Sequence, residues 1–156
     1  MASQRSRPLR AFRIADMRHT IFDGRGAMLH GARWNSPGRL VVYASESYAG
    51  ALLEILAHAS GSVPRSQGYI EIEIPADVSI EEVTPGDLPD WDSPSFETAR
   101  AFGDRWYDER RTPVLMVPSV ATRIERNILL NQEHPDFARI RASQPLPVRW
   151  DERLWT

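Results

Sequence analysis

The sequence contains no cysteine, no lysine and no long apolar run. Without cysteine, a disulfide framework, a thiolate metal site and a cysteine nucleophile are all excluded. No stretch approaches the roughly 18 apolar residues of a membrane-spanning helix, and the polar, basic N-terminus has no apolar core of signal-peptide length. These absences predict a cytoplasmic protein that has no membrane partner.

Charges of the two signs are nearly balanced, because 19 basic residues, all arginine, face 21 acidic residues and leave a formal charge of -2. A protein that binds nucleic acid by neutralising phosphates usually carries a basic surplus. We therefore expect no direct binding of nucleic acid. The length of 156 residues suits one core of ordinary size, so we expect a single domain over residues 1–156.

Common signatures of metal and nucleotide sites are also missing. The glycine-rich segment FDGRGA (22–27) has neither the P-loop pattern nor the spacing of a Rossmann loop. Ser119 is not in a GxSxG elbow, which disfavours a hydrolase-type serine nucleophile. The histidines do not have the close ligand spacing of zinc motifs, so we expect no metal site. These histidines are His19, His30, His58 and His134.

Apolar periodicity predicts a mixture of strands and helices. Strands are expected over 8–15, 40–44, 68–75, 113–119 and, at the end of the chain, 145–155. Helices are expected over 47–59 and 95–110, the first with Ser45 or Ser47 as its N-cap. Loops should surround the short segment AMLH within 20–39, the stretch 75–95 should be irregular, and 123–140 should form a helix or loop.

The expected helix over 47–59 is apolar on nearly every side, which is typical of a buried helix. Within it, Gly50, Glu54 and His58 lie four residues apart on one stripe, so the small glycine should clear space one turn before the carboxylate. Burial of an uncompensated carboxylate costs on the order of several kcal/mol. Glu54 must therefore be paired, be protonated or lie at the wall of a cleft.

Three further polar side chains accompany the expected strands. Arg33 precedes the strand over 40–44, Tyr43 lies within that strand, and Ser119 follows a late strand. A buried tyrosine hydroxyl needs a partner or a ligand. A purely structural interpretation is open at this point, in which Arg33 pairs with Glu54. Tyr43 would then belong to the core and Ser119 to a turn.

These residues and the segments around them resemble a known family. The segments FRI, GRGAMLHGARWNSPGRLVVYASESYAGALLEILAH, GDRWYDERRTPVLMVPSV, NILLNQEHPDF and WDERL occur in this order. Over about residues 9–155 the chain resembles the RES-domain family, which is named for an arginine, a glutamate and a serine. The three residues fall on Arg33, Glu54 and Ser119, and further pocket positions fall on Arg13 and Tyr43.

The resemblance implies an α/β (α+β) fold of the ADP-ribosyltransferase type, with a mixed split sheet, flanking helices and a cleft for NAD. It implies an enzyme that uses NAD as its substrate, cleaves the nicotinamide–ribose bond and passes ADP-ribose to water, phosphate or a protein. It also implies the toxin of a type II toxin–antitoxin system. The expected partners are a Xre-type antitoxin and, for transfer to protein, a cellular acceptor.

On this resemblance the expected catalytic residues are Glu54, Arg33 and Ser119, and the expected NAD-binding residues are these three with Arg13 and Tyr43. Departure of nicotinamide leaves an oxocarbenium-like charge on the ribose, which a fixed carboxylate at Glu54 would stabilise. The forked guanidinium groups of Arg13 and Arg33 suit the pyrophosphate.

Two smaller roles complete this expectation. Tyr43 would stack on nicotinamide or orient a ribose, and Ser119 would donate to the nicotinamide amide or to a ribose hydroxyl. Two other functions stay open, a nuclease-type toxin that uses arginine, glutamate and histidine, and a non-catalytic partner-binding domain. A nuclease-type toxin would be expected to show a basic face for phosphate contacts.

Overall fold

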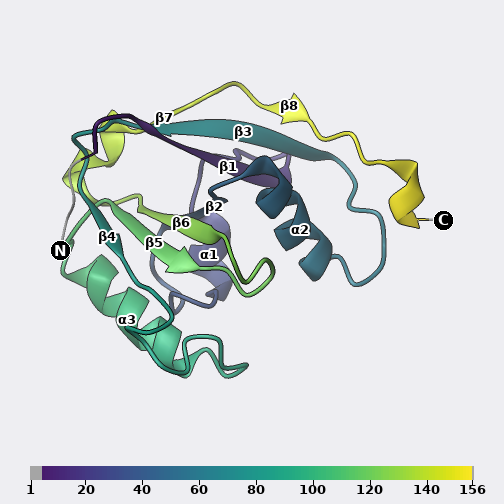
Figure 1. The fold of residues 1–156 in the computed structure, drawn as a ribbon. Helices are drawn as coiled ribbons and strands as arrows, with labels where there is room; N and C mark the ends of the chain where they lie inside the picture. Colours follow the sequence, from purple (N-terminus) through teal and green to yellow (C-terminus); the bar gives the residue numbers. More distant parts are fainter. Residues whose placement is uncertain (1–4, 156) are drawn as a thin grey trace.

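The computed structural model describes residues 5–155, in which helices flank a mixed sheet (Figure 1). The helices are α1 (Arg25–His30), α2 (Tyr48–His58) and α3 (Glu97–Asp108). The strands are β1 (Leu9–Asp16), β2 (Val41–Ser45), β3 (Gln67–Ile74), β4 (Ile80–Glu82), β5 (Val114–Pro118), β6 (Arg126–Asn131), β7 (Arg141–Ala142) and β8 (Leu146–Pro147). Their order in the sheet is β4-β5-β6-β2-β1-β3-β7, and β8 pairs with β3. Strands β4 and β5 are parallel, and the other pairs are antiparallel.

The sheet is nearly divided between β1 and β2. These two strands share a single pair of facing residues, Phe12 and Ser45, whereas β1 pairs with β3 along its whole length and β2 with β6 along its whole length. Because so short a ladder joins β1 to β2, the half made of β1, β3 and β7 diverges from the half made of β4, β5, β6 and β2 (Figure 1). The mixed split sheet that the sequence resemblance implies is therefore confirmed.

Two apolar clusters bury the two faces of the central strands. One contains residues from both halves of the sheet, such as Val42 of β2 and Ile72 of β3. The other joins α3 to the half that contains β5, β6 and β2, with Trp106 and Val41 among its members. A strand that is buried on both faces has a continuous apolar sequence. This is why the run LVVYA (40–44) predicts β2 correctly.

Strand β6 corrects the expectation of a helix or loop over 123–140. It lies between β5 and β2, and Ile128, Leu129 and Leu130 are completely buried. Periodicity cannot distinguish a strand from a buried helix in so short an apolar run. The pairing of β6 with both neighbours, which decides the matter, depends on segments that are distant in the sequence.

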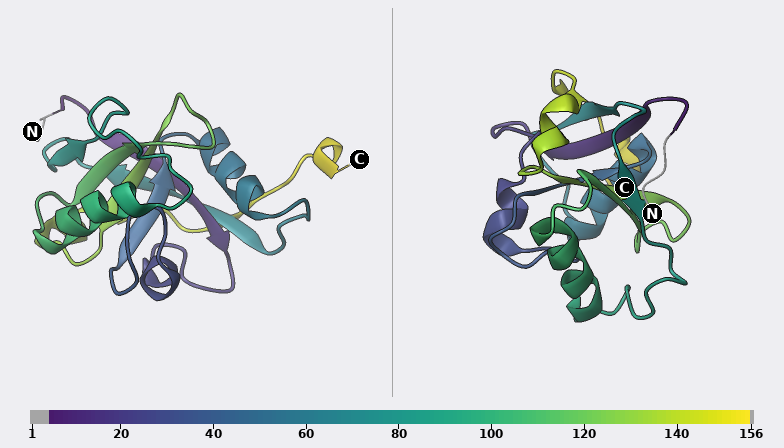
Figure 2. Two further views of the ribbon diagram at one scale, coloured as in Figure 1. Left: turned by 90° about the horizontal axis from the view of Figure 1, so that it is seen from below. Right: turned by 90° about the vertical axis from the view of Figure 1, so that its left-hand side faces the viewer.

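The stretch 75–95 is not wholly irregular, because it contains β4, an edge strand with a buried Ile80. The final strand expected over 145–155 is wrong except at β8, and a 3-10 helix over Glu152–Trp155 follows. Proline has no N–H group to donate, so the alternation of proline around Leu146 prevents a continuous ladder. The segment that ends in this 3-10 helix extends away from the sheet (Figure 2).

Helix α2 begins as the sequence predicts, because the Ser47 side chain caps it by accepting a hydrogen bond from Gly50 N. It is less buried than its apolar composition predicts, and Leu53 is 41% exposed. A Cβ atom at Gly50 would lie 2.8 Å from Glu125 Oε1. The glycine therefore makes room for the side chain of Glu125. The helical stripe in the sequence had suggested Glu54 instead.

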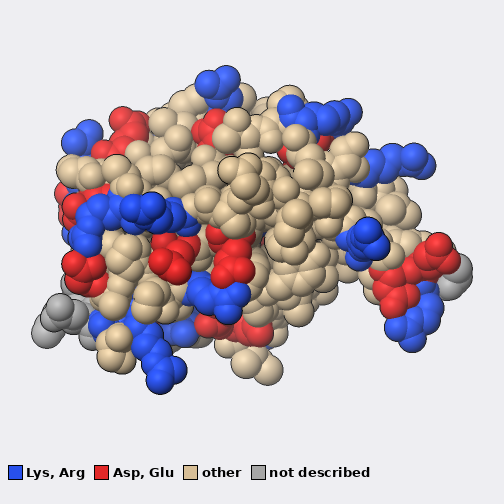
Figure 3. Space-filling view, turned by 90° about the horizontal axis from the view of Figure 1, so that it is seen from above, with Lys and Arg blue, Asp and Glu red and all other residues tan. Residues whose placement is uncertain are grey.

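The surface carries arginines and acids side by side. On the face that Figure 3 shows, blue and red side chains alternate and form no continuous basic field. Many arginines of the described residues form ion pairs near the surface, such as Arg111 with Glu81 and Arg126 with Glu82. Within residues 5–155, no helix is both long enough and apolar enough to cross a bilayer.

Candidate active site

A cavity of about 560 Å³ opens where the sheet divides. Its walls come from β1, β2, β6, α2, the segment before β2, the end of β5 with the residues that follow it, and Phe96. The volume lies in the range of small-molecule sites. Ser119 is absent from the walls, whereas the other four expected site residues belong to them. The main polar side chains of the walls are Arg13, Arg33, Tyr43, Ser45, Glu54 and Asn127.

Helix α2 presents Glu54 to the cavity, and two neutral donors fix its carboxylate. Glu54 Oε1 accepts hydrogen bonds from Ser119 Oγ at 2.9 Å and from Asn127 Nδ2 at 3.1 Å. Within residues 5–155, Glu54 Oε2 accepts no hydrogen bond and Glu54 forms no ion pair. Of the alternatives that the sequence leaves, the structure thus places Glu54 at the wall of a cleft, with one oxygen held and the other unengaged.

Ser119 lies behind Glu54 and is 1% exposed. Its Oγ also accepts a hydrogen bond from Thr122 N at 3.2 Å, and its backbone carbonyl accepts one from Arg123 N at 2.9 Å, so it is part of a turn after β5. A hydroxyl group has one hydrogen to donate. Because Glu54 receives that hydrogen, this geometry favours a positioning role for Ser119 over direct donation to a ligand.

Arg33 is held by backbone oxygens and by an aromatic ring. Its Nη1 donates to Ser93 O at 3.0 Å, and its guanidinium lies 4.4 Å from the centroid of the Phe96 ring. Burial lowers the pKa of Arg33, and the negative charges of Asp92 and Glu54 oppose that shift. No carboxylate among residues 5–155 lies within ion-pair distance of it, so the salt bridge between Arg33 and Glu54 in the structural interpretation is absent.

Arg13 is a second cavity arginine whose partners in residues 5–155 are backbone carbonyls rather than carboxylates. Its Nε donates to Ile21 O at 2.7 Å and its Nη1 to Tyr43 O at 2.9 Å. Burial lowers the pKa of Arg13, with an opposing effect from Asp23. A desolvated guanidinium without an ion-pair partner is poised to bind an anion, because an anion supplies both a close negative charge and the missing acceptors.

The hydroxyl of Tyr43 is already engaged. It donates to Asn35 Oδ1 at 2.7 Å and accepts a hydrogen bond from Trp34 N at 3.1 Å. Burial is the main reason why the pKa of Tyr43 is raised. The hydroxyl thus fixes the backbone next to Arg33, and only the ring of Tyr43 remains to contact a ligand.

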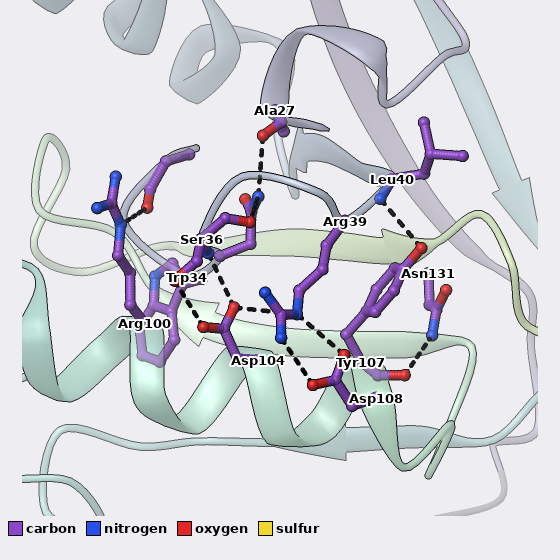
Figure 4. A network of polar contacts seen from close by, with 12 residues as sticks. Ala27, Trp34, Ser36, Arg39, Leu40, Arg100, Asp104, Tyr107, Asp108 and Asn131 are labelled. Carbon is purple, nitrogen blue, oxygen red and sulfur yellow. Dashed lines mark hydrogen bonds and ion pairs between the residues drawn. The ribbon is translucent and has the colours of Figure 1, made fainter. Parts of the chain in front are cut away.

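Helix α3 holds the same segment from the other side, through the polar network drawn in Figure 4. Arg100 Nε donates to Ala32 O at 2.7 Å. The Asp104 carboxylate accepts from Ser36 N at 2.8 Å and from Ser36 Oγ at 2.7 Å, and it also pairs with Arg39. The residues on both sides of Arg33 are therefore tied to one helix.

Gly103 brings α3 into direct contact with this segment. A Cβ atom at Gly103 would lie 1.8 Å from Trp34 O, which is far inside van der Waals contact. Trp34 is buried, and its ring meets Phe102 edge-on. The close approach explains how α3 can set the position of the backbone that carries Arg33.

One histidine, His58, belongs to the cavity wall. In the part of the chain that the structure describes, no three histidine, aspartate or glutamate side chains are grouped as metal ligands. The Nδ1 atom of His58, at the cavity wall, lies 2.8 Å from the backbone oxygen of Glu54. His58 therefore belongs to the end of α2 rather than to a histidine cluster.

The sequence interpretation misses two residues of this site. Asn127 reaches the cavity from β6, in a segment for which no strand is expected, so nothing in the sequence directs it toward Glu54. Phe96 lies at the start of α3 in the left-handed conformation, with φ of 64°, and covers Arg33. Its place at an apolar helical spacing predicts core, and only the tertiary fold reveals the contact.

Comparison with known proteins gives the family context of this geometry. The chain is 41% identical over 136 residues to the Prs ADP-ribosylating toxin of Sphingobium sp. (strain YBL2). This alignment covers 84% of this chain and 84% of that protein. It is 35% identical over 149 residues to Toxin Res of Yersinia enterocolitica, with coverage of 92% and 97%.

A solved structure shares the fold. A chain of the M. tuberculosis MbcT-MbcA toxin-antitoxin complex superposes with a TM-score of 0.74 at 14% identity, over 93% of this chain and 86% of that chain. The α/β (α+β) fold class that the sequence predicts is thereby confirmed. The family model of the RES domain matches residues 7–151. Because this match covers nearly its whole length, the chain belongs to the RES domain family.

Proposed function

We propose that this RES-domain protein is the toxin of a toxin–antitoxin pair, and that it cleaves NAD at the nicotinamide–ribose bond in the cavity at the split of the sheet. The observation that carries the proposal is the shared cavity of Glu54, Arg13 and Arg33: one carboxylate with an unengaged oxygen, and two guanidinium groups without ion-pair partners among residues 5–155. The similarity to a relative named as an ADP-ribosylating toxin supports the same chemistry.

The arginines fit the pyrophosphate of a dinucleotide. Arg13 and Arg33 are both desolvated, and each spends donors on backbone carbonyls while other N–H groups remain for a ligand. A guanidinium can bind phosphate oxygens through two parallel hydrogen bonds, which a point charge cannot do. In this proposal the diphosphate supplies the ion-pair partner that both arginines lack among residues 5–155.

Glu54 fits the reacting end of the molecule. When the C–N bond between ribose and nicotinamide breaks, the bonding electrons leave with the nicotinamide nitrogen and positive charge develops on the ribose. A carboxylate whose Oε1 is fixed by Ser119 and Asn127 would stabilise that charge through Oε2 without reorganising. ADP-ribose then passes to an acceptor, which is a protein, water or phosphate.

The remaining expected residues support these groups in the proposal. Ser119 positions Glu54, and Tyr43 positions the segment that carries Arg33 while offering its ring to the ligand. The partners are a Xre-type antitoxin that restrains the enzyme and, for transfer to protein, a cellular acceptor. The site of action is the cytoplasm, where both NAD and such partners are found.

Incubation of the purified protein with NAD, followed by measurement of free nicotinamide, tests this function. We expect nicotinamide release, and labelled NAD with cell extract would then reveal whether a protein receives ADP-ribose. Release of nucleotides from RNA or DNA without nicotinamide would identify a nuclease instead. Activity on neither substrate, with tight binding of an antitoxin, would identify a non-catalytic partner-binding domain.

A further inference from the structure

The side-chain amide of Asn127 contacts the carboxylate of Glu54 at the cavity wall. Asn127 is on β6, directly opposite Ser45 of β2 in the antiparallel register, and all three side chains belong to the cavity wall. Asn127 Nδ2 lies 3.1 Å from Glu54 Oε1, and Asn127 Oδ1 lies 3.3 Å from Ser45 Oγ. The amide therefore connects the last residue of a central strand to the carboxylate of α2.

The chemistry of these neighbours fixes which way the amide points. An ionised carboxylate only accepts hydrogen bonds, so the atom of Asn127 that faces Glu54 must be the nitrogen. The oxygen then faces Ser45, whose hydroxyl can donate to it. An amide nitrogen carries two hydrogens. Glu54 takes one of them, and the second has no acceptor among residues 5–155.

Ser119 cannot offer a ligand the same contact. Its only hydroxyl hydrogen goes to Glu54, and its side chain does not reach the cavity wall. Asn127 and Ser119 thus bind the same oxygen of Glu54, one from the cavity side and one from the buried side. Because only Asn127 belongs to the cavity wall, only Asn127 can also contact a ligand.

We propose that Asn127 both positions Glu54 and binds the ligand, with one amide hydrogen on Glu54 Oε1 and the other on an oxygen of NAD close to the scissile bond. This inference rests on the proposed function and adds a residue to it. The acceptor is a ribose hydroxyl or the carboxamide oxygen of nicotinamide, both of which lie close to that bond. Ser45 holds the amide in the required orientation through Asn127 Oδ1.

Kinetics of nicotinamide release from NAD test both halves of the role. Asn127→Asp keeps the shape of the side chain but removes both hydrogens and places an acceptor against Glu54, so we expect kcat to fall by about 100-fold. Asn127→Ala should lower kcat by about 10-fold and raise KM for NAD, because the ligand also loses a donor. Gln132→Glu is the matched control, since it makes the same change of amide to carboxylate outside the cavity and keeps the acceptor for Gly24 N.

Wild-type values of kcat and KM in both Asn127 variants would overturn the proposal. So would a loss of activity that matches the unfolded fraction measured by thermal denaturation. Because these variants can also fail to fold, a second measurement uses the side-chain amide resonances of Asn127 in the otherwise native protein. Glu54→Gln should shift these resonances without any ligand, since the positioning contact exists in the free protein.

Adding NAD to the Glu54→Gln protein should shift the Asn127 amide resonances again. If NAD shifts other cavity resonances, such as those of Ala44 and Ala57, and leaves the Asn127 amide unchanged, the ligand contact is wrong. If Glu54→Gln leaves the Asn127 amide unchanged, the positioning contact is wrong. If NAD shifts no resonance at all and the wild type releases no nicotinamide, the proposed function itself fails, and only the positioning contact is then left to stand.

Discussion

Ser119 and Glu54 lie 65 positions apart in the sequence, and Ser119 Oγ donates a hydrogen bond to Glu54 Oε1 over 2.9 Å. The contact joins the turn after β5 to the middle of α2, and Asn127 of β6 completes it from the cavity side. Two donors on one oxygen leave Glu54 Oε2 unengaged among the described residues. The polar groups around Glu54 thus prepare a fixed negative charge at the cavity wall rather than neutralise it.

Substitution Glu54→Gln tests that charge. The amide oxygen can still accept from Ser119 and Asn127, so we expect the fold and its thermal stability to be retained. Without the negative charge, the developing cation on the ribose loses its stabilisation, and kcat for nicotinamide release should fall on the order of 10²- to 10³-fold. Glu71→Gln provides a matched control, because Glu71 is on β3 outside the cavity wall and pairs with Arg10. Equal turnover in the Glu54 variant and the control would remove Glu54 from the reaction.

Substitution Arg33→Lys tests the forked contact with phosphate. A lysine keeps the charge but has one ammonium group, so it cannot bind Ser93 O and two phosphate oxygens in the same geometry. We expect the Kd for NAD, measured by calorimetric titration, to rise about 10-fold, which corresponds to about 1.4 kcal/mol. Arg10→Lys, on the exposed side of β1, should leave the Kd unchanged. An unchanged Kd at Arg33→Lys would place the pyrophosphate elsewhere.

Substitution Tyr43→Phe removes a hydroxyl with two buried partners. Asn35 Oδ1 and Trp34 N would lose their hydrogen bonds, so the free energy of unfolding should fall by about 1–3 kcal/mol at pH 7. Burial raises the pKa of Tyr43 in the folded protein, so the stability that its neutral hydroxyl provides is complete below pH 10 and decreases as the pH rises further.

Urea denaturation at pH 7 and at pH 11 measures both effects of Tyr43. The difference in free energy of unfolding between wild type and Tyr43→Phe should be largest at pH 7 and smaller at pH 11. Tyr69→Phe is the control, because the Tyr69 hydroxyl makes no hydrogen bond within residues 5–155. A difference that grows with pH would contradict the assignment of a buried neutral hydroxyl to Tyr43.

Substitution Gly103→Ala tests the approach of α3 to the segment that carries Arg33. The new methyl group would meet Trp34 O, so α3 or that segment must move, at a cost of about 1–3 kcal/mol in the free energy of unfolding. The displacement should also raise KM for NAD in the folded fraction. Gly26→Ala in α1, where a Cβ atom would meet nothing within 4 Å, should leave KM unchanged and stabilise the protein slightly. Equal stability of the two variants would contradict the close packing at Gly103.

The parts of the fold that the sequence predicts are those whose signal is local. The run LVVYA gives β2, the alternation in GYIEIEIP gives β3, and Ser47 marks the start of α2. Strands β4 and β6 are missed because short segments become strands only through pairing with β5 or β2, a fact that no local pattern contains. The alternation of proline around Leu146 is a local signal against a continuous final strand. The strand expected over 145–155 did not take this signal into account.

The residues of the candidate site also fall into those that a local sequence pattern identifies and those that it does not. The sequence identifies Glu54 as an acid in an apolar helix and Arg33 through the family resemblance, and both belong to the cavity. It does not reveal that Ser119 lies behind Glu54, outside the cavity wall, or that Asn127 belongs to that wall. Those orientations depend on how the turn after β5 and the strand β6 lie against α2, and the register of strands distant in sequence decides that.

The last prediction concerns the antitoxin and rests on the proposed function. A cavity with two desolvated arginines, neither of which has an ion-pair partner among residues 5–155, attracts a carboxylate or polar tail as well as a pyrophosphate. We therefore expect the antitoxin to inhibit by occupying the cavity, in competition with NAD. An enzyme that consumes NAD should also be poorly tolerated by cells that lack this inhibitor.

Steady-state inhibition measured at several NAD concentrations tests the competition. Raising NAD should partly restore nicotinamide release when the antitoxin is limiting, and the apparent inhibition constant should rise in proportion to NAD above its KM. Arg33→Ala should weaken the binding of both NAD and the antitoxin, whereas Arg10→Ala should weaken neither, since Arg10 is exposed and paired with Glu71. Inhibition that does not depend on NAD, together with an antitoxin interface that lies away from Arg13 and Arg33, would contradict occlusion of the cavity. The antitoxin would then have to act at a distance, by shifting a segment that holds the site, such as the contact between α3 and the residues around Arg33.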